Sequence, residues 1–192
     1  RDRPEPAAGH RGVDLGSVVA HLGRTLPPDS ILTNGAGNYS VWLHRFYAYR
    51  RGRTELAPTC GAMGYGLPAA VAASLRHPGR QVVCMAGDGC FLMYPQELAT
   101  AAEYGARLIV LVANNGMYGT IRMHQERRHP GRVSGTRLQG PDYVMLARSF
   151  GAHAERIEQT EDFAAAFARA QAAQGLALLE LVTDPLQITP QM

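Results

Sequence analysis

Residues 81–116 read QVVCMAGDGCFLMYPQELATAAEYGARLIVLVANNG, and this stretch decides the fold. Residues 81–86 and 108–113 are almost entirely apolar, and residues 96–104 between them have a helical pattern. Strands that are apolar on both faces and are joined by helices are typical of a parallel sheet covered on both sides. The prediction is an α/β three-layer sandwich, with a mostly parallel central sheet flanked by helices.

The alternation of strands and helices continues on both sides of this unit. Strands are predicted over residues 31–33, 154–157 and 178–182, and helices over residues 15–26, 68–76, 142–150 and from 160 onward. Asp14, Asp142 and Thr160 are the expected N-caps of three of these helices. Residues 126–140 form the one long irregular stretch, and loops of that length are often functional lids or disordered segments.

Polar residues follow two of the apolar strands at the point where each strand ends. Gly87-Asp88-Gly89 follows the first strand of the opening stretch, and Asn114-Asn115-Gly116 follows the second. Ligands of open parallel sheets bind beyond the carboxyl ends of the strands. Asp88 and Asn115 are 27 residues apart, which is close to the roughly 30 residues of a strand–helix–strand unit. Both side chains are therefore expected on one rim of the sheet.

The residue types at this rim point to a particular ligand. A carboxylate, an amide oxygen and nearby main-chain carbonyls are hard oxygen donors, which suit Mg²⁺ or Ca²⁺ better than zinc or copper. The glycines around Asp88 let backbone N–H groups approach an anion, and the N-terminus of a following helix would add positive charge. Each motif alone is also a common turn sequence. Together, one crossover apart, they predict a magnesium-bridged diphosphate site.

At these residues the chain resembles the thiamine diphosphate (ThDP)-dependent decarboxylase and carboligase superfamily, and most closely its acetolactate synthase and benzoylformate decarboxylase branch. The resemblance extends from about residue 13 to residue 185. It implies that ThDP and Mg²⁺ are the cofactors, with Asp88 and Asn115 binding the metal by side chains and Met117 by its main-chain carbonyl. It also implies that residues 13–192 are the diphosphate-binding domain after a linker of residues 1–12, with the pyrimidine-binding and central domains absent from this chain.

Two further segments carry the resemblance. Residues 60–70, CGAMGYGLPAA, are similar to the family's GxMGxGLPAA segment, which implies that Met63 supports the bent cofactor and that the Gly61 carbonyl accepts from its 4′-amino group. Residues 34–39, NGAGNY, are similar to its diphosphate loop. The remaining cofactor contacts implied by the resemblance are Gly37, Asn38, Gly87, Gly89, Cys90 and Tyr118. We interpret the Cys90 side chain as a space-filling group and not as a nucleophile.

The implied activity is that of a lyase or transferase acting on a 2-oxo acid, a decarboxylase or carboligase. In the family, the glutamate that activates the cofactor lies on a pyrimidine-binding domain, usually of a partner subunit in a homo-oligomer. No segment here matches that domain, so we assign no catalytic residue to this chain and expect no turnover by it alone. Acetolactate synthases typically carry QWQ after the asparagine pair, where this chain has Met123-His124-Gln125, and the difference puts acetolactate synthesis in doubt.

Two other functions compete with this one. A non-catalytic or regulatory Mg-ThDP-binding module stays open as the alternative. A Rossmann-type nucleotide-binding domain predicts GxGxxG after its first strand. Gly35-Ala36-Gly37 begins that pattern, but Ser40 stands where the last glycine should be.

Composition excludes several other classes. The basic residues are scattered, and we interpret the densest cluster, Arg127, Arg128 and Arg132, as a solvated loop and not as a nucleic-acid surface. The three cysteines have no CxxC spacing, which argues against a disulfide framework or a zinc site and favours a reducing, cytoplasmic location. No apolar run approaches the roughly 20 residues of a membrane span, so no membrane association is expected.

Overall fold

The computed structural model describes residues 11–173 and 175–190, so most of the expected linker, residues 1–12, lies outside the described residues. Within them, a sheet of six strands has the order β2-β1-β3-β4-β6-β5, and every pair of neighbours is parallel. The strands are β1 Ile31–Asn34, β2 Glu55–Leu56, β3 Val82–Gly87, β4 Leu108–Asn114, β5 His153–Ile157 and β6 Leu176–Val182. The predicted parallel α/β architecture is confirmed.

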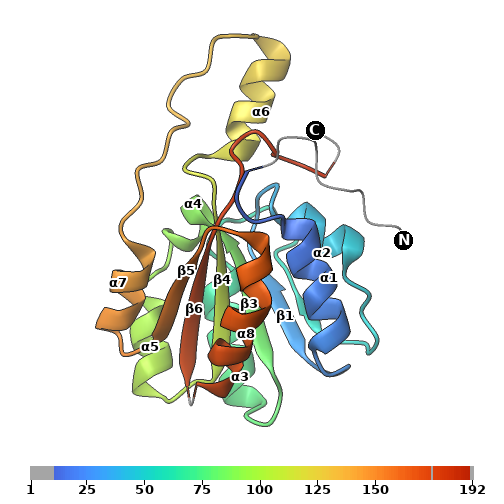
Figure 1. Ribbon diagram of the computed structural model, residues 1–192, viewed down its shortest axis with the longest axis vertical. Coiled ribbons are helices and arrows are strands. Elements are labelled where there is room, and N and C mark those ends of the chain that lie inside the picture. The colour runs from blue at the N-terminus through green and yellow to red at the C-terminus, as the bar shows by residue number, and fades with distance from the viewer. Residues whose placement is uncertain (1–10, 174, 191–192) are drawn as a thin grey trace.

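Helices cover both faces of this sheet (Figure 1). They are α1 Leu15–Thr25, α2 Ser40–Phe46, α3 Gly66–Arg76, α4 Asp88–Phe91, α5 Glu97–Glu103, α6 Gly119–Arg128, α7 Tyr143–Ser149 and α8 Phe163–Ala172. One layer contains α1, α2 and α8, and the other contains α3, α5 and α7, while α6 rises away from the body. In the described part of the chain, no helix is long and apolar enough to span a membrane.

The apolar runs are continuous because the central strands are buried on both faces. In β4, Ile109 and Leu111 belong to the core beneath α1 and α8, whereas Leu108, Val110 and Val112 belong to the core beneath α3, α5 and α7. Burial of a Leu, Ile or Val side chain is worth roughly 1.5–3 kcal/mol. A polar residue at any of these positions would lose that contribution and would also bury an unsatisfied group.

The register of the sheet brings the strand ends together at one rim. Gly87 pairs with Ala113 at the end of the β3–β4 ladder, and Asn114 pairs with Val182 at the end of the β4–β6 ladder. The loops that follow β1, β3 and β4 therefore emerge side by side, at the upper end of the sheet in Figure 1. This rim is where the polar motifs were expected.

Three local predictions were wrong. Thr160 does not cap a helix: its hydroxyl accepts from the Asp14 N–H at 2.9 Å, and a 3₁₀ turn, Thr160–Asp162, precedes α8. Residues 126–140 are not irregular throughout, because α6 extends to Arg128. The helix expected after the Gly87-Asp88-Gly89 motif does not follow it, because the four-residue α4 begins at Asp88 inside the motif and is too short to develop a substantial macrodipole.

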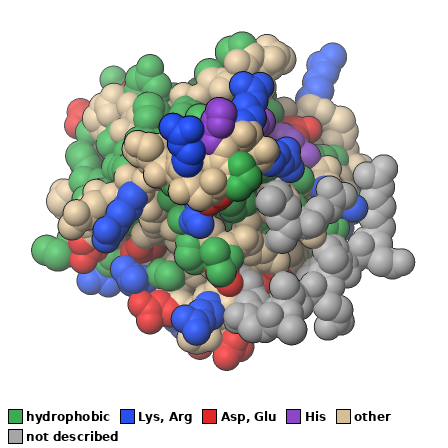
Figure 2. Space-filling view, turned by 90° about the horizontal axis from the view of Figure 1, so that it is seen from above, with side chains coloured by type: hydrophobic (Ala, Val, Ile, Leu, Met, Phe, Trp, Pro, Cys, Tyr) green, Lys and Arg blue, Asp and Glu red, His purple; other side chains and the backbone are tan. Residues whose placement is uncertain are grey.

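Sequence patterns did not predict α2, β2 or the start of α6. The reason is clearest for α6, in which only Met123 is buried, so that the helix shows no apolar periodicity. The arginines of the basic cluster, Arg127, Arg128 and Arg132, are exposed at the end of α6 and in the loop after it. Seen from above in Figure 2, Arg and His side chains gather over this part of the molecule.

The Asp14 cap of α1 provides a test of the fold. Its carboxylate accepts from the N–H groups of Gly16 and Ser17, and the residue is 4% exposed. We expect Asp14→Ala to lower the free energy of unfolding by about 1–2 kcal/mol, because those N–H groups lose their partner. Urea denaturation should show a lower midpoint at an unchanged slope. Asp14→Asn keeps a side-chain acceptor and should lose less than half as much; an equal loss would contradict the capping role.

Candidate functional site

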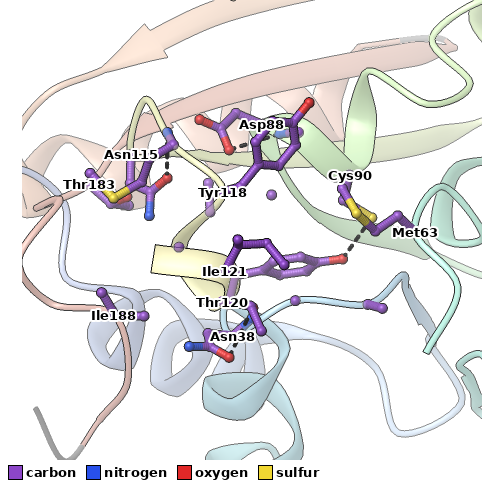
Figure 3. Close-up of a pocket in the computed structure, with 18 of the residues that line it drawn as sticks. Asn38, Met63, Asp88, Cys90, Asn115, Tyr118, Thr120, Ile121, Thr183 and Ile188 are labelled. Carbon is purple, nitrogen blue, oxygen red and sulfur yellow. Dashed lines mark hydrogen bonds between the residues drawn. The ribbon is translucent and has the colours of Figure 1, made fainter. Parts of the chain in front are cut away.

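A pocket of about 230 Å³ opens at the carboxyl rim of the sheet, and we call it the rim pocket (Figure 3). Its walls come from the loops after β1, β3 and β4, from the segment before α3, and from the segment after β6. Every site residue expected from the sequence lines it: Gly37, Asn38, Gly61, Met63, Gly87, Asp88, Gly89, Cys90, Asn115, Met117 and Tyr118. Segments far apart in the sequence thus meet at one cavity.

Asp88 is a buried carboxylate, only 3% exposed. One of its oxygens accepts from the N–H of Gly89 at 2.8 Å, and the other accepts from the N–H of Gly116, after β4, also at 2.8 Å. Burial raises the pKa of Asp88 to about 6, although these backbone donors favour the ionised form. Among the described residues, no Lys, Arg or His forms an ion pair with Asp88. A cation at this point would compensate the buried charge.

Asn114, the last residue of β4, and Asn115, the first residue after it, have different environments. The side chain of Asn114 turns into the sheet and donates to Glu180 of β6 at 2.7 Å. The Asn115 side chain lies at the rim pocket, and its amide oxygen accepts from the Met117 N–H at 3.2 Å (Figure 3). The second asparagine is therefore the one whose oxygen can face a ligand in the pocket.

The oxygen donors of the rim pocket are of mixed chemical type. Within residues 11–173 and 175–190, no group of three or more His, Cys, Asp and Glu side chains could hold a metal. A cation in this pocket would therefore use the Asp88 carboxylate together with amide and main-chain carbonyl oxygens. Mg²⁺ fits such a set, because it typically takes few protein ligands and completes its octahedron with phosphate oxygens and water.

Neighbouring aromatic rings explain why glycine is required at both Gly87 and Gly89. A Cβ atom at Gly87 would lie 2.8 Å from the Tyr39 ring, and one at Gly89 would lie 2.5 Å from the Tyr118 ring. Any side chain at either position would displace a ring that lines the pocket. Glycine at both positions therefore lets these two rings pack directly against the backbone at the end of β3.

Cys90 is an acceptor that joins two segments. Its sulfur accepts from the Tyr39 hydroxyl and from the Gly64 N–H, each at 3.2 Å. Burial raises the pKa of Tyr39 well above its usual value, so the hydroxyl keeps its proton and can donate it. The interpretation of Cys90 as a small space-filling group is consistent with this packing, but the residue also makes two polar contacts.

Some residues of the rim pocket were not expected from the sequence. Thr183 follows β6, so the rule that ligands lie beyond carboxyl strand ends could have indicated it. Thr120 carries no motif, and its hydroxyl contacts Asn38, which is 82 residues away. The remaining pocket residues of this kind are largely apolar, namely Leu15, Ala36, Tyr39, Trp42, Ala113, Gly119, Ile121 and Ile188, with Gln187 as the polar exception. Apolar side chains give no sequence signal that separates a pocket wall from a core.

Comparison with known proteins relates the rim pocket to one family. The family model described as "Thiamine pyrophosphate enzyme, C-terminal TPP binding domain" matches residues 35–181. That range contains all the site residues expected from the sequence.

Curated relatives and a solved structure agree with this match. The chain is 35% identical over 160 residues to the acetolactate synthase large subunit of Corynebacterium glutamicum, covering 80% of this chain and 26% of the relative. It is 34% identical over 172 residues to the acetolactate synthase isozyme 2 large subunit of Escherichia coli, covering 88% of this chain and 31% of the relative. A thiamine diphosphate-dependent 4-hydroxybenzoylformate decarboxylase of Rhodococcus jostii superimposes with a TM-score of 0.87 and 31% identity, covering 96% of this chain and 35% of that one. The chain thus spans about a third or less of the length of these proteins.

The raised pKa of Asp88 predicts a conflict between stability and the charge at this site. A folded-state pKa near 6, against an unfolded value near 3.9, corresponds to roughly 3 kcal/mol. Because the folded pKa is the higher one, the fold binds the Asp88 proton more tightly than the unfolded chain does. The stabilisation from this protonated carboxyl is therefore fully present below pH 4 and is lost as pH rises through 6. In EDTA, Asp88→Asn should therefore be more stable than wild type at pH 8, and the difference should shrink toward pH 5. Urea unfolding at both pH values measures it, and an Asp88→Asn variant that is less stable than wild type at pH 8 would contradict the assignment.

Proposed function

Since this chain belongs to the thiamine pyrophosphate enzymes, as their C-terminal TPP-binding domain, we propose that its rim pocket binds ThDP as a magnesium complex. The observation that carries the proposal is the buried carboxylate of Asp88, which has no cationic partner among the described residues and lies at the wall of the pocket. A divalent cation would compensate that charge and would itself attract a diphosphate.

Three residues would bind the metal in this proposal. Asp88 and Asn115 contribute side-chain oxygens, and Met117 contributes its main-chain carbonyl. That carbonyl also accepts from the Gly119 N–H at 3.0 Å, and a carbonyl has a second lone pair for a metal. Phosphate oxygens and water complete the octahedron that Mg²⁺ requires.

The rest of the pocket would hold the cofactor. We assign diphosphate contacts to the backbone of Gly87, Gly89 and Cys90 and to the loop that contains Gly37 and Asn38. Met63, which is 36% exposed and lines the pocket, supports the cofactor from its apolar side, with Gly61 and Tyr118 on neighbouring walls. When bound, ThDP supplies the electron sink for chemistry on a 2-oxo acid, while the protein orients it and excludes water.

The whole enzyme would be a 2-oxo acid decarboxylase or carboligase of which this chain is one domain. No glutamate is among the described residues that line the rim pocket, so the activating carboxylate is assigned to a pyrimidine-binding domain of the same or a partner subunit in a homo-oligomer. Cys84 and Cys90 are free thiols in the interior, which suits a reducing compartment, and we propose the cytoplasm.

Titration with ThDP tests the binding proposal. Trp42 lines the rim pocket and is 3% exposed, so its fluorescence should report occupancy. Binding should require Mg²⁺, and Asp88→Ala should weaken it by more than the roughly 10–100-fold that loss of an outer-shell partner costs. Asp142→Ala removes an exposed helix cap elsewhere and is the matched control. Equal Mg²⁺-dependent affinity in the Asp88→Ala variant and wild type would refute the metal assignment.

A second experiment tests where the proton chemistry originates. With Mg-ThDP bound, the 192-residue chain alone should release no CO₂ from pyruvate or benzoylformate above a protein-free control. The reason is that the pocket offers no glutamate to activate the cofactor. Fusion to a pyrimidine-binding domain that carries the glutamate should restore turnover. Robust decarboxylation by the chain alone would overturn the domain assignment, and failure of the fusion would favour a non-catalytic Mg-ThDP-binding module.

A further inference from the structure

Side-chain hydrogen bonds link the loops around the rim pocket in pairs. The Tyr39 hydroxyl donates to Cys90, which joins the loop after β1 to the turn after β3. The Asp88 carboxylate accepts from Gly116, which joins that turn to the loop after β4. In the strand order β1-β3-β4, these two links connect neighbours. A third link is needed to close the circuit between the outer two loops.

Asn38 and Thr120 form that third link (Figure 3). The main-chain N–H of Asn38 donates to the Thr120 hydroxyl at 3.1 Å, and the hydroxyl donates back to the Asn38 side-chain oxygen at 3.0 Å. The Asn38 amide nitrogen lies 3.4 Å from the sulfur of Met123, one turn further along α6. Because β3 lies between β1 and β4, this contact crosses over the Gly87-Asp88-Gly89 turn and closes the ring of loops. We call it the Asn38–Thr120 clasp.

The clasp engages both ends of the Asn38 side chain. Both ends of its side-chain amide and its main-chain N–H have protein partners. The second N–H of the amide group stays available to a diphosphate, so the clasp is compatible with a ligand contact at this residue. Through the clasp, Asn38 also holds the Gly37 backbone at a fixed place on the pocket wall.

The clasp also matters to α6 because this helix has few other attachments. Met123 is its only buried residue, and the helix rises away from the body (Figure 1). Its first turn nevertheless lines the rim pocket through Gly119, Thr120 and Ile121. A polar helix with so little apolar contact depends on specific polar links to fix its base. Thr120 provides one from the second residue of the helix.

We propose that Thr120 is a positioning residue for the cofactor: its hydroxyl, through Asn38, fixes the diphosphate loop and the base of α6 around the rim pocket before the ligand arrives. This inference rests on the proposed function, since the ligand positioned is Mg-ThDP. Preorganised loops lose less conformational freedom on binding, so the clasp should raise affinity.

Hydrogen exchange in the ligand-free chain tests the clasp independently of any ligand. Thr120→Val keeps the shape of the side chain and removes the hydroxyl. It should increase exchange at the amides of Gly37, Asn38 and Tyr39 by about tenfold, the effect of one lost hydrogen bond. Thr120→Ser should restore wild-type exchange. Thr25→Val, at the exposed end of α1, is the matched control and should leave these amides unchanged. No change in the Thr120→Val variant would overturn the proposal.

Titration of the same variants with Mg-ThDP tests the consequence. Thr120→Val should bind about tenfold more weakly, Thr120→Ser should bind within about twofold of wild type, and the melting temperatures of the ligand-free variants should stay close together. Equal affinity of the Thr120→Val and wild-type chains for Mg-ThDP would contradict the positioning role, even if hydrogen exchange had changed. If no variant binds Mg-ThDP while the exchange result holds, the proposed function fails and the clasp stands as a structural link.

Discussion

The parallel pairing of β3 with β4 is the constraint on which the rest of the structure depends. Its last pair, Gly87 with Ala113, brings the turn after β3 within reach of the loop after β4, and the Gly116 N–H then donates to the Asp88 carboxylate. The pairing is itself secured by apolar side chains on both faces of each strand, packed beneath helices on either side. The rim pocket exists because this register puts two polar strand ends next to each other.

The buried charge that the pocket needs for cation binding lowers the stability of the ligand-free fold. A carboxylate at Asp88 is buried with backbone donors as its only described partners, and burial raises its pKa to about 6. Such a charge is costly until a cation arrives, and cation binding can return that energy as affinity. The glycines of the turn are similarly determined by contacts, because the rings of Tyr39 and Tyr118 occupy the space that side chains would need.

Side-chain hydrogen bonds tie the segments around the pocket to one another. Tyr39 with Cys90, Asp88 with Gly116, and Asn38 with Thr120 each join segments that follow different strands. These links allow loops to carry ligand contacts while the sheet beneath them stays rigid. The residues of the site therefore have two different roles. Some face the ligand, and others hold the ligand-facing residues in position.

The sequence by itself determined the sheet, its parallel direction and the rim at which Asp88 and Asn115 meet, because apolar runs and the strand–helix–strand spacing are local properties of the chain. It did not indicate α6, whose polar surface has no apolar period, nor the true role of Thr160, whose hydroxyl bonds to the Asp14 backbone. Nor did it indicate Thr120, which meets Asn38 across 82 residues. Only the tertiary structure decided those contacts, because they depend on the packing of distant segments and leave no pattern in the neighbouring residues.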